Sequence, residues 1–241
     1  DATRSHHVNE RDIILENMPS YSSVFAVNYD SPYLFYPIFE PHGKSVAGLL
    51  TLSKFDINGS VRRSLPIEDS LMKLVDLDRC YTVSRIDTDD GHELVLFTIH
   101  LSAYTSDGTI ATEQLKMLIS QMREEYGKGN YVVCGGDFNK DLLSDSAALF
   151  GVSGDEYTWA QPFPEELLEG SGISLIAPYS AQNPVPSCRN ADGPYTDDQY
   201  VLTVDGFMVS DNVEVLQSQV LDTGFAYSDH NPVKMTFRLI G

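Results

Sequence analysis

The stretch Tyr131-Val132-Val133-Cys134-Gly135-Gly136-Asp137-Phe138-Asn139 narrows the choice of fold more than any other part of this sequence. Its apolar first half predicts a short buried strand. Two glycines then allow a sharp turn, so Asp137 and Asn139 are expected at the carboxyl end of that strand, where α/β proteins usually place their functional groups. Because Gly, Asp and Asn are also the ordinary residues of turns, the stretch alone does not separate a functional site from a loop.

Three other segments place polar residues at the ends or flanks of apolar runs. Each contains a histidine, an aspartate or both, the residue types that transfer protons or bind metal ions in active sites. In chain order the segments are Ile99–Tyr104 (IHLSAY), Val204–Val209 (VDGFMV) and Ser228–Val233 (SDHNPV).

Together with the first stretch, these segments resemble, as an ordered set, the endonuclease/exonuclease/phosphatase superfamily. Its members include pancreatic deoxyribonuclease, abasic-site endonucleases, neutral sphingomyelinases and inositol phosphate 5-phosphatases. The resemblance implies an α/β (α+β) fold, a four-layer sandwich in which two packed mixed β-sheets are flanked by helices. It also implies a single domain over residues 1–241 that acts as a metal-dependent phosphoesterase.

The resemblance implies a role for each matched residue. His230 would handle a proton or stabilise the transition state, and Asp205 would orient its imidazole. Asp137 and Asn139 would position the attacking water or hold a second ion, while Asp229 would be a ligand of the metal ion. An ordinary surface histidine before an Asn-Pro pair is the competing interpretation of His230. Because the other residues of the set match as well, the functional role is favoured.

Three further residues are candidates for contacts with the substrate phosphate. His100 would donate to a phosphate oxygen, although a hydrogen-bonded histidine at a strand end remains an alternative. Tyr104 would add a second donor. Arg189 offers a planar guanidinium suited to phosphate, and a structural ion pair is an equally good interpretation of it.

The expected cofactor is Mg²⁺, with Mn²⁺ or Ca²⁺ as possibilities, because hard oxygen ligands suit these ions. Members of the superfamily begin with a strand carrying an Asn, a helix, and a strand ending in Gln-Glu, whose Glu is a principal metal ligand. No such segment is found from Asp1 onward, and Glu10 and Glu16 lie in a predicted helix. We therefore expect the domain to lack its opening strand, helix and Gln-Glu motif, and the 241-residue piece to fold poorly alone.

Composition favours a soluble globular protein with a small substrate. Hydrophobic residues make up 42% and charged residues 21% of the 241 residues, and no apolar stretch is long enough to span a bilayer. The net charge of −19, from 16 basic and 35 acidic residues, makes long nucleic acids poor partners. A small-molecule or lipid phosphoester is the expected substrate. We expect a monomer, either cytoplasmic or tethered to a membrane by an upstream segment.

Hydrophobic periodicity predicts a series of helices and strands. The region between Phe150 and Tyr200, rich in proline, is expected to be irregular and to form the walls of a substrate cleft. The predicted elements are helices over Asn9–Leu15 and Ile110–Tyr126, the latter ended by Gly127, and strands over Ser23–Asn28, Val46–Ser53, Cys80–Asp87, Glu93–His100 and Val233–Leu239, with a tight turn at Asp89-Asp90-Gly91.

The leading hypothesis is thus a Mg²⁺-dependent hydrolase of phosphoester bonds. Two alternatives stay open at this point. One is a non-catalytic binding domain of the same fold, and the other is a nuclease with a local basic groove.

Overall fold

The computed structural model describes residues 2–3, 5–34, 43–66, 79–103, 109–153, 160–191 and 193–241. The chain divides into two compact units, Asp1–His100 and Leu101–Gly241, each described by itself below. Strands predominate in both units and each contains helix as well, which confirms the predicted α/β class. None of the helices in the described ranges is long and apolar enough to cross a membrane.

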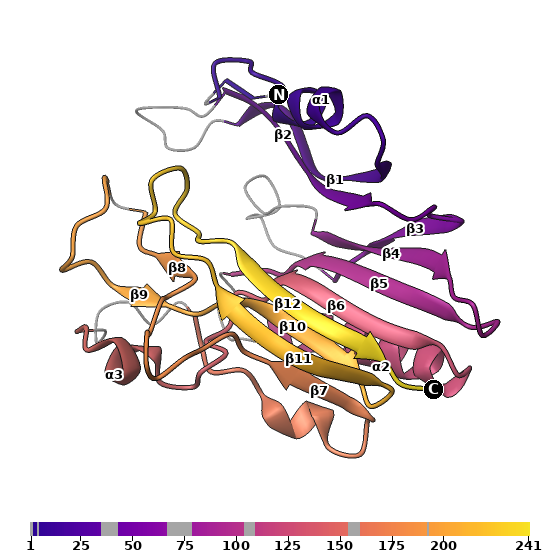
Figure 1. Cartoon of the computed structure of the whole chain (residues 1–241). Helices are drawn as coiled ribbons and strands as arrows, with labels where there is room; N and C mark the ends of the chain where they lie inside the picture. Colours follow the sequence, from indigo (N-terminus) through magenta and orange to yellow (C-terminus); the bar gives the residue numbers. More distant parts are fainter. Residues whose placement is uncertain are drawn as a thin grey trace. The chain divides into compact units, whose positions relative to one another are not determined.

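The first unit is built from two antiparallel sheets that pack against each other (Figure 1). Buried Ala26, Leu49 and Cys80 form a small core between them. The hydroxyls of Thr51 and Thr98 hydrogen-bond from one sheet to the other at 2.8 Å. The elements are α1 (Glu10–Asn17), β1 (Ser22–Leu34) paired with β2 (Gly43–Ser53), and β3 (Gly59–Ser64), β4 (Cys80–Asp87) and β5 (Glu93–His100) in that order.

Most local predictions for this unit are confirmed. The N-terminal helix exists, and the Asn9 side chain caps it by accepting a hydrogen bond from the Asp12 N–H at 3.4 Å. Strands β4 and β5 have the predicted bounds and form the expected hairpin, with Gly91 at a φ of 85° in its turn. Strands β1 and β2 are longer than predicted, because their pairing continues through irregular registers beyond Val27.

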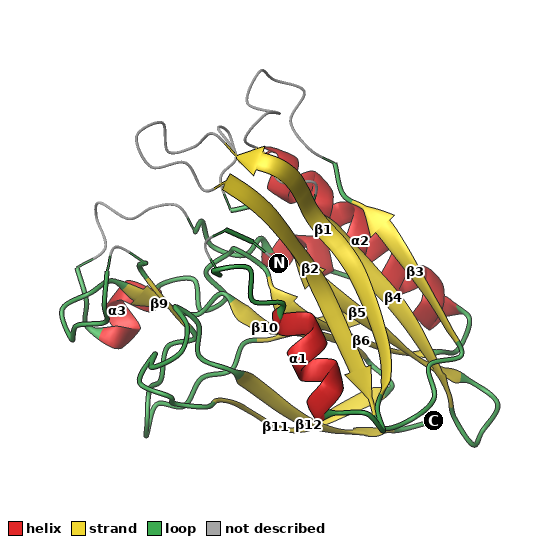
Figure 2. Ribbon diagram, turned by 90° about the horizontal axis from the view of Figure 1, so that it is seen from above, coloured by secondary structure: helices red, strands yellow, loops and turns green. Residues whose placement is uncertain are grey.

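The second unit has three layers (Figure 1; Figure 2). A central antiparallel sheet is covered on one face by α2 and on the other by the β11–β12 hairpin. The sheet order is β6 (Tyr131–Asp137), β10 (Asp205–Ser210), β7 (Ile173–Ile176). The remaining elements are α2 (Thr109–Gly127), α3 (Ser146–Phe150), a 3₁₀ turn η2 (Glu165–Leu168), β8 (Cys188–Arg189) paired with β9 (Val201–Leu202), and β11 (Val213–Val220) paired with β12 (Val233–Leu239).

Apolar periodicity explains both covering layers. Helix α2 buries the apolar stripe predicted from the sequence. The four residues of that stripe, Leu115, Leu118, Ile119 and Met122, are at most 4% exposed. Strand β12 alternates half-buried and exposed residues along its length, as predicted.

Two predictions for this unit are wrong in detail. Helix α2 runs through Gly127 rather than ending before it, and the glycine with positive φ is Gly129, at 90°. The region from Phe150 to Tyr200 is irregular over most of its described residues, as predicted, but it also contains short regular elements that were not predicted. It contributes β7, which pairs with β10 at the edge of the sheet, and β8, which pairs with β9.

Candidate active site

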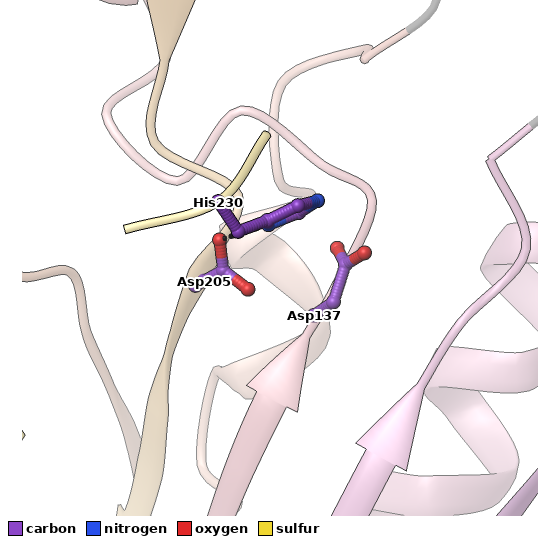
Figure 3. A group of neighbouring side chains, drawn as sticks. All are labelled: Asp137, Asp205 and His230. Atoms are coloured by element: carbon purple, nitrogen blue, oxygen red, sulfur yellow. Dashed lines mark hydrogen bonds and ion pairs between the residues drawn. The ribbon is translucent and has the colours of Figure 1, made fainter. Parts of the chain in front are cut away.

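Two aspartates emerge side by side from neighbouring strands of the second unit. Asp137 ends β6, Asp205 opens β10, and the two are direct partners in the antiparallel register. Figure 3 shows their carboxylates at the strand ends, with the ring of His230 extending from Asp205 towards Asp137. Gly206 makes this arrangement possible, because a Cβ there would lie 2.6 Å from Leu142 Cδ1 and 3.0 Å from the Ile176 carbonyl oxygen.

His230 and Asp205 form an ion pair. The His230 Nδ1 lies 2.7 Å from Asp205 Oδ2, and the side chains are 32% and 14% exposed. A carboxylate can only accept, so Nδ1 carries the proton that is shared with Asp205. The backbone holds His230 from two directions, since its N–H donates to Ser228 Oγ at 3.1 Å and its main chain bridges to Cys188.

Asp137 and Asn139 form a tight local turn. The Asn139 N–H donates to Asp137 Oδ1 at 2.8 Å, and its Nδ2 donates to the Leu101 carbonyl oxygen at 2.7 Å and to Asp137 Oδ2 at 3.3 Å. Asn139 has a φ of 48°, in the left-handed region, which asparagine adopts more readily than other residues with a side chain apart from aspartate. Its NH₂ group is thus used for hydrogen bonds, and Oδ1 is the remaining polar atom of this buried side chain.

The surroundings of His230 favour its charged form. Burial alone would lower the pKa of His230, but the hydrogen bonds with Asp205 and Cys188 outweigh burial and raise the pKa to about 11. Burial raises the pKa of the Cys188 thiol more than neighbouring His230 lowers it, so Cys188 is a neutral thiol at neutral pH. The His230 ring is therefore charged at neutral pH and lies against the Asp205 carboxylate.

This leads to a prediction for the pH dependence of the ion pair. The pKa of His230 in the folded protein lies above its ordinary value of 6.5, so the pair stabilises the fold fully below pH 6.5 and loses that effect as the pH rises through about 11. In chelator-treated protein, NMR of the imidazole should show the charged ring up to about pH 9. A ring that titrates near its ordinary pKa would contradict the pairing.

The other predicted site residues are placed differently. Asp229 is half-buried and lies outside the Asp137–Asp205–His230 cluster; its Oδ1 accepts from Ser228 Oγ at 3.3 Å. His100 ends β5 in the first unit. Tyr104 lies outside the described residues.

Arg189 lies in β8, and loop carbonyl groups bind its guanidinium. Its Nη1 donates to the carbonyl oxygens of Asn190 at 2.8 Å and Gly193 at 2.9 Å. Its Nε is buried and without a hydrogen-bond partner, and the group lies 6.0 Å from the centre of the Phe225 ring. No ion pair with a carboxylate is found for Arg189 among the described residues, so the predicted structural ion pair is not seen there.

Two residues that sequence reasoning did not select lie directly against the ion pair. Ser187 Oγ is 2.8 Å from Asp205 Oδ2, and Cys188 Sγ is 3.5 Å from His230 Nε2. Both are buried, with exposures of 0% and 4%. Their only sequence signal is proximity to Arg189 in a proline-rich stretch, which does not reveal contacts with residues so distant along the chain.

The donor atoms of the cluster fit a hard divalent cation. One potential ligand atom from each of Asp137, Asp205 and His230 lies within 4.8 Å of the other two. The charged imidazole of His230 has no lone pair for a metal, so the two carboxylates are the ligands that the cluster offers. Asp205 and His230 bind each other, and the Asp137 carboxylate accepts hydrogen bonds from Asn139, so a metal ion would share these oxygens with their present partners. A metal site with few protein oxygen ligands, in which water and substrate phosphate fill the other positions, is typical of Mg²⁺. Zn²⁺ prefers nitrogen and sulfur ligands.

A scan against protein-family models and a search of curated proteins find no match. Similar solved structures are numerous. An endonuclease/exonuclease/phosphatase protein from Beutenbergia cavernae is 17% identical, with a TM-score of 0.61 over 96% of this chain and 57% of that one. This chain thus spans little more than half of that protein.

Two phosphatases are among the other similar structures. The 2',3'-cyclic phosphatase ANGEL2, in complex with adenosine-2',3'-vanadate, is 16% identical, with a TM-score of 0.62 over 98% of this chain and 79% of that one. The mannosyl-6-phosphatase of Bacteroides thetaiotaomicron is 16% identical, with a TM-score of 0.57 over 95% and 80% of the two chains. At such identities the comparison shows the fold, which is that of endonuclease/exonuclease/phosphatase proteins, as the sequence motifs predict.

Proposed function

We propose that this protein is a Mg²⁺-dependent hydrolase of phosphoester bonds. The observation that carries the proposal is the Asp205–His230 ion pair, which lies beside Asp137 at the ends of two neighbouring strands. The likeness in fold to a 2',3'-cyclic phosphatase and a mannosyl-6-phosphatase supports the same class of reaction. The four-layer sandwich that the resemblance implies for the whole domain also remains a prediction.

Asp229 would be a ligand of the metal ion, and Asp137 and Asn139 would hold a second ion or position the attacking water. Mg²⁺ is the ion that we propose, and Mn²⁺ or Ca²⁺ would take the same oxygen donors. When bound, the ion neutralises charge on the phosphate oxygens.

The chain's own residues would supply the remaining chemistry. Asp137 and Asn139 would hold a water in line with the phosphorus atom. His230, charged and fixed by Asp205, would donate to the oxygen on which negative charge develops as the ester bond breaks. His100, Tyr104 and Arg189 are proposed to contact other phosphate oxygens.

The charge of the protein favours a small-molecule or lipid phosphoester as substrate. With a net charge of −19, a long polyanion would be repelled by most of the surface, whereas a single phosphate needs only a local positive site. The imidazolium of His230 supplies such a charge next to Asp137. We propose that the protein works as a monomer, and a membrane tether upstream would suit a lipid substrate.

Hydrolysis assays on the protein as its gene encodes it test this proposal. A generic phosphomonoester and a generic phosphodiester are incubated with Mg²⁺ or with EDTA, and a plasmid is included as a third substrate. We expect chelator-sensitive hydrolysis of at least one small ester, and slow or no cutting of the plasmid. Failure to hydrolyse any of the three would favour the non-catalytic binding domain, and preferential cutting of the plasmid would favour the nuclease.

A further inference from the structure

We propose that Ser187 is a positioning residue that fixes the Asp205–His230 pair for catalysis, a role that rests on the function proposed above. Ser187 directly precedes β8 and is fully buried. It has no exposed atom with which to contact a substrate. Its contacts nevertheless place it at the centre of the candidate active site.

The hydrogen bonds of the Ser187 hydroxyl define its direction. The oxygen accepts from the backbone N–H of Val204 at 3.0 Å and of Asp205 at 3.1 Å. Both lone pairs are then used, so the single hydroxyl proton is donated to Asp205 Oδ2 at 2.8 Å. The same Oδ2 binds His230 Nδ1 at 2.7 Å. Ser187 therefore fixes the rotation of the carboxylate that holds the imidazole.

The main chain of Ser187 connects the two segments that carry the pair. Its N–H donates to the Leu202 carbonyl oxygen at 3.1 Å, three residues before Asp205. Its carbonyl oxygen accepts from the Asn231 N–H at 2.7 Å, directly after His230. The backbone of Ser187 thus sets the spacing between the two segments, while its hydroxyl sets the orientation of the carboxylate.

Loss of the hydroxyl is expected to change turnover more than substrate binding. Without it, Asp205 Oδ2 keeps a single partner and the carboxylate is free to rotate, which misplaces His230. Groups that orient an active-site residue in this way typically contribute about tenfold to a hundredfold to activity. The KM should change little, because Ser187 touches no substrate.

Ser146 provides a matched control. It is also fully buried, its hydroxyl donates to Asp141 Oδ1 at 2.6 Å, and it accepts from the Thr203 N–H at 3.2 Å. Ser146 and Ser187 thus have the same chemical setting. In each case the hydroxyl donates to an aspartate and accepts from the backbone of the segment that leads into β10. Asp141, however, does not bind His230, so Ser146→Ala should lower stability without disturbing the ion pair.

The experiment compares Ser187→Ala and Ser146→Ala, each with and without His230→Ala. Turnover per folded molecule and KM are measured in Mg²⁺, and ¹H–¹⁵N NMR follows the Nδ1–H signal of His230. We expect Ser187→Ala to lower kcat by about tenfold to a hundredfold, with KM within about twofold, and to shift or abolish that signal. Ser146→Ala should do neither, and in the His230→Ala background Ser187→Ala should cause no further fall.

An unchanged kcat and Nδ1–H signal in Ser187→Ala would overturn the proposal, as would an equal fall in kcat in the His230→Ala background. Should Ser187→Ala fail to fold, Ser187→Cys, which fills the same space with a weaker donor, takes its place with the same expectations. If the wild type hydrolyses no phosphoester, the proposed function fails, and the NMR comparison alone decides whether Ser187 positions the pair.

Discussion

Replacement of His230 by alanine is expected to lower kcat by about a hundredfold to ten-thousandfold, the usual contribution of a positioned proton donor. The imidazolium beside Asp205 is the cationic group next to the Asp137 carboxylate, so its loss removes both the proton and the charge that would face the phosphate. The fold should survive, because the ring is 32% exposed and adds little to the core. Turnover of a small phosphoester, scaled to the folded fraction, measures the effect.

His92→Ala is the control for this variant. His92 is exposed, in the turn between β4 and β5, and is not part of the cluster. Its replacement should leave kcat unchanged. If His230→Ala unfolded the protein while activity per folded molecule stayed at the wild-type level, His230 would be a structural residue and the assigned role would be wrong.

The second large effect is expected from Asp137→Asn. The amide keeps an oxygen that accepts the Asn139 N–H, but it loses the longer bond from Asn139 Nδ2 to Oδ2 and the negative charge that would bind the metal ion. We expect kcat to fall by at least about a hundredfold, and the Mg²⁺ concentration for half-maximal activity to rise. A Mg²⁺ titration of the phosphoesterase rate measures both quantities.

Asp141→Asn is a matched control four residues further along. Asp141 is buried and accepts from the Leu143 N–H and from both the N–H and the hydroxyl of Ser146. Its replacement should lower the free energy of unfolding by about 1–3 kcal/mol, because buried donors lose their partner, without changing the Mg²⁺ dependence. A reversed pattern, with Asp141→Asn affecting Mg²⁺ and Asp137→Asn affecting only stability, would move the metal site away from Asp137.

The sequence predicts the ends of the central strands well. An apolar run before Asp137 and another after Asp205 mark two strand ends, and the resemblance assigns both residues to one site. What the pattern does not contain is the register. The direct pairing of Asp137 with Asp205 across β6 and β10 depends on contacts between residues far apart in the chain.

Ser187 and β7 show why the rest of the site and fold could not be predicted. Hydrogen bonds link Ser187 to residues 17 and 18 positions away and leave no periodic trace in the sequence. Strand β7, at four residues, is too short for an alternating pattern, and it is fixed by its pairing with β10 at the sheet edge. In both cases long-range contacts decide a local structure that composition alone identifies as loop.

A crystal structure of the protein grown with Mg²⁺ and orthovanadate tests the central claim most directly. Vanadate imitates the phosphorus centre during hydrolysis, so it should bind where the reaction takes place. We predict vanadate between Asp137 and His230, with Nε2 of His230 turned from Cys188 to a vanadate oxygen and an ion bound to Asp137. Vanadate bound elsewhere, or a His230 that still contacts Cys188 beside an empty cluster, would contradict the assignment of this site.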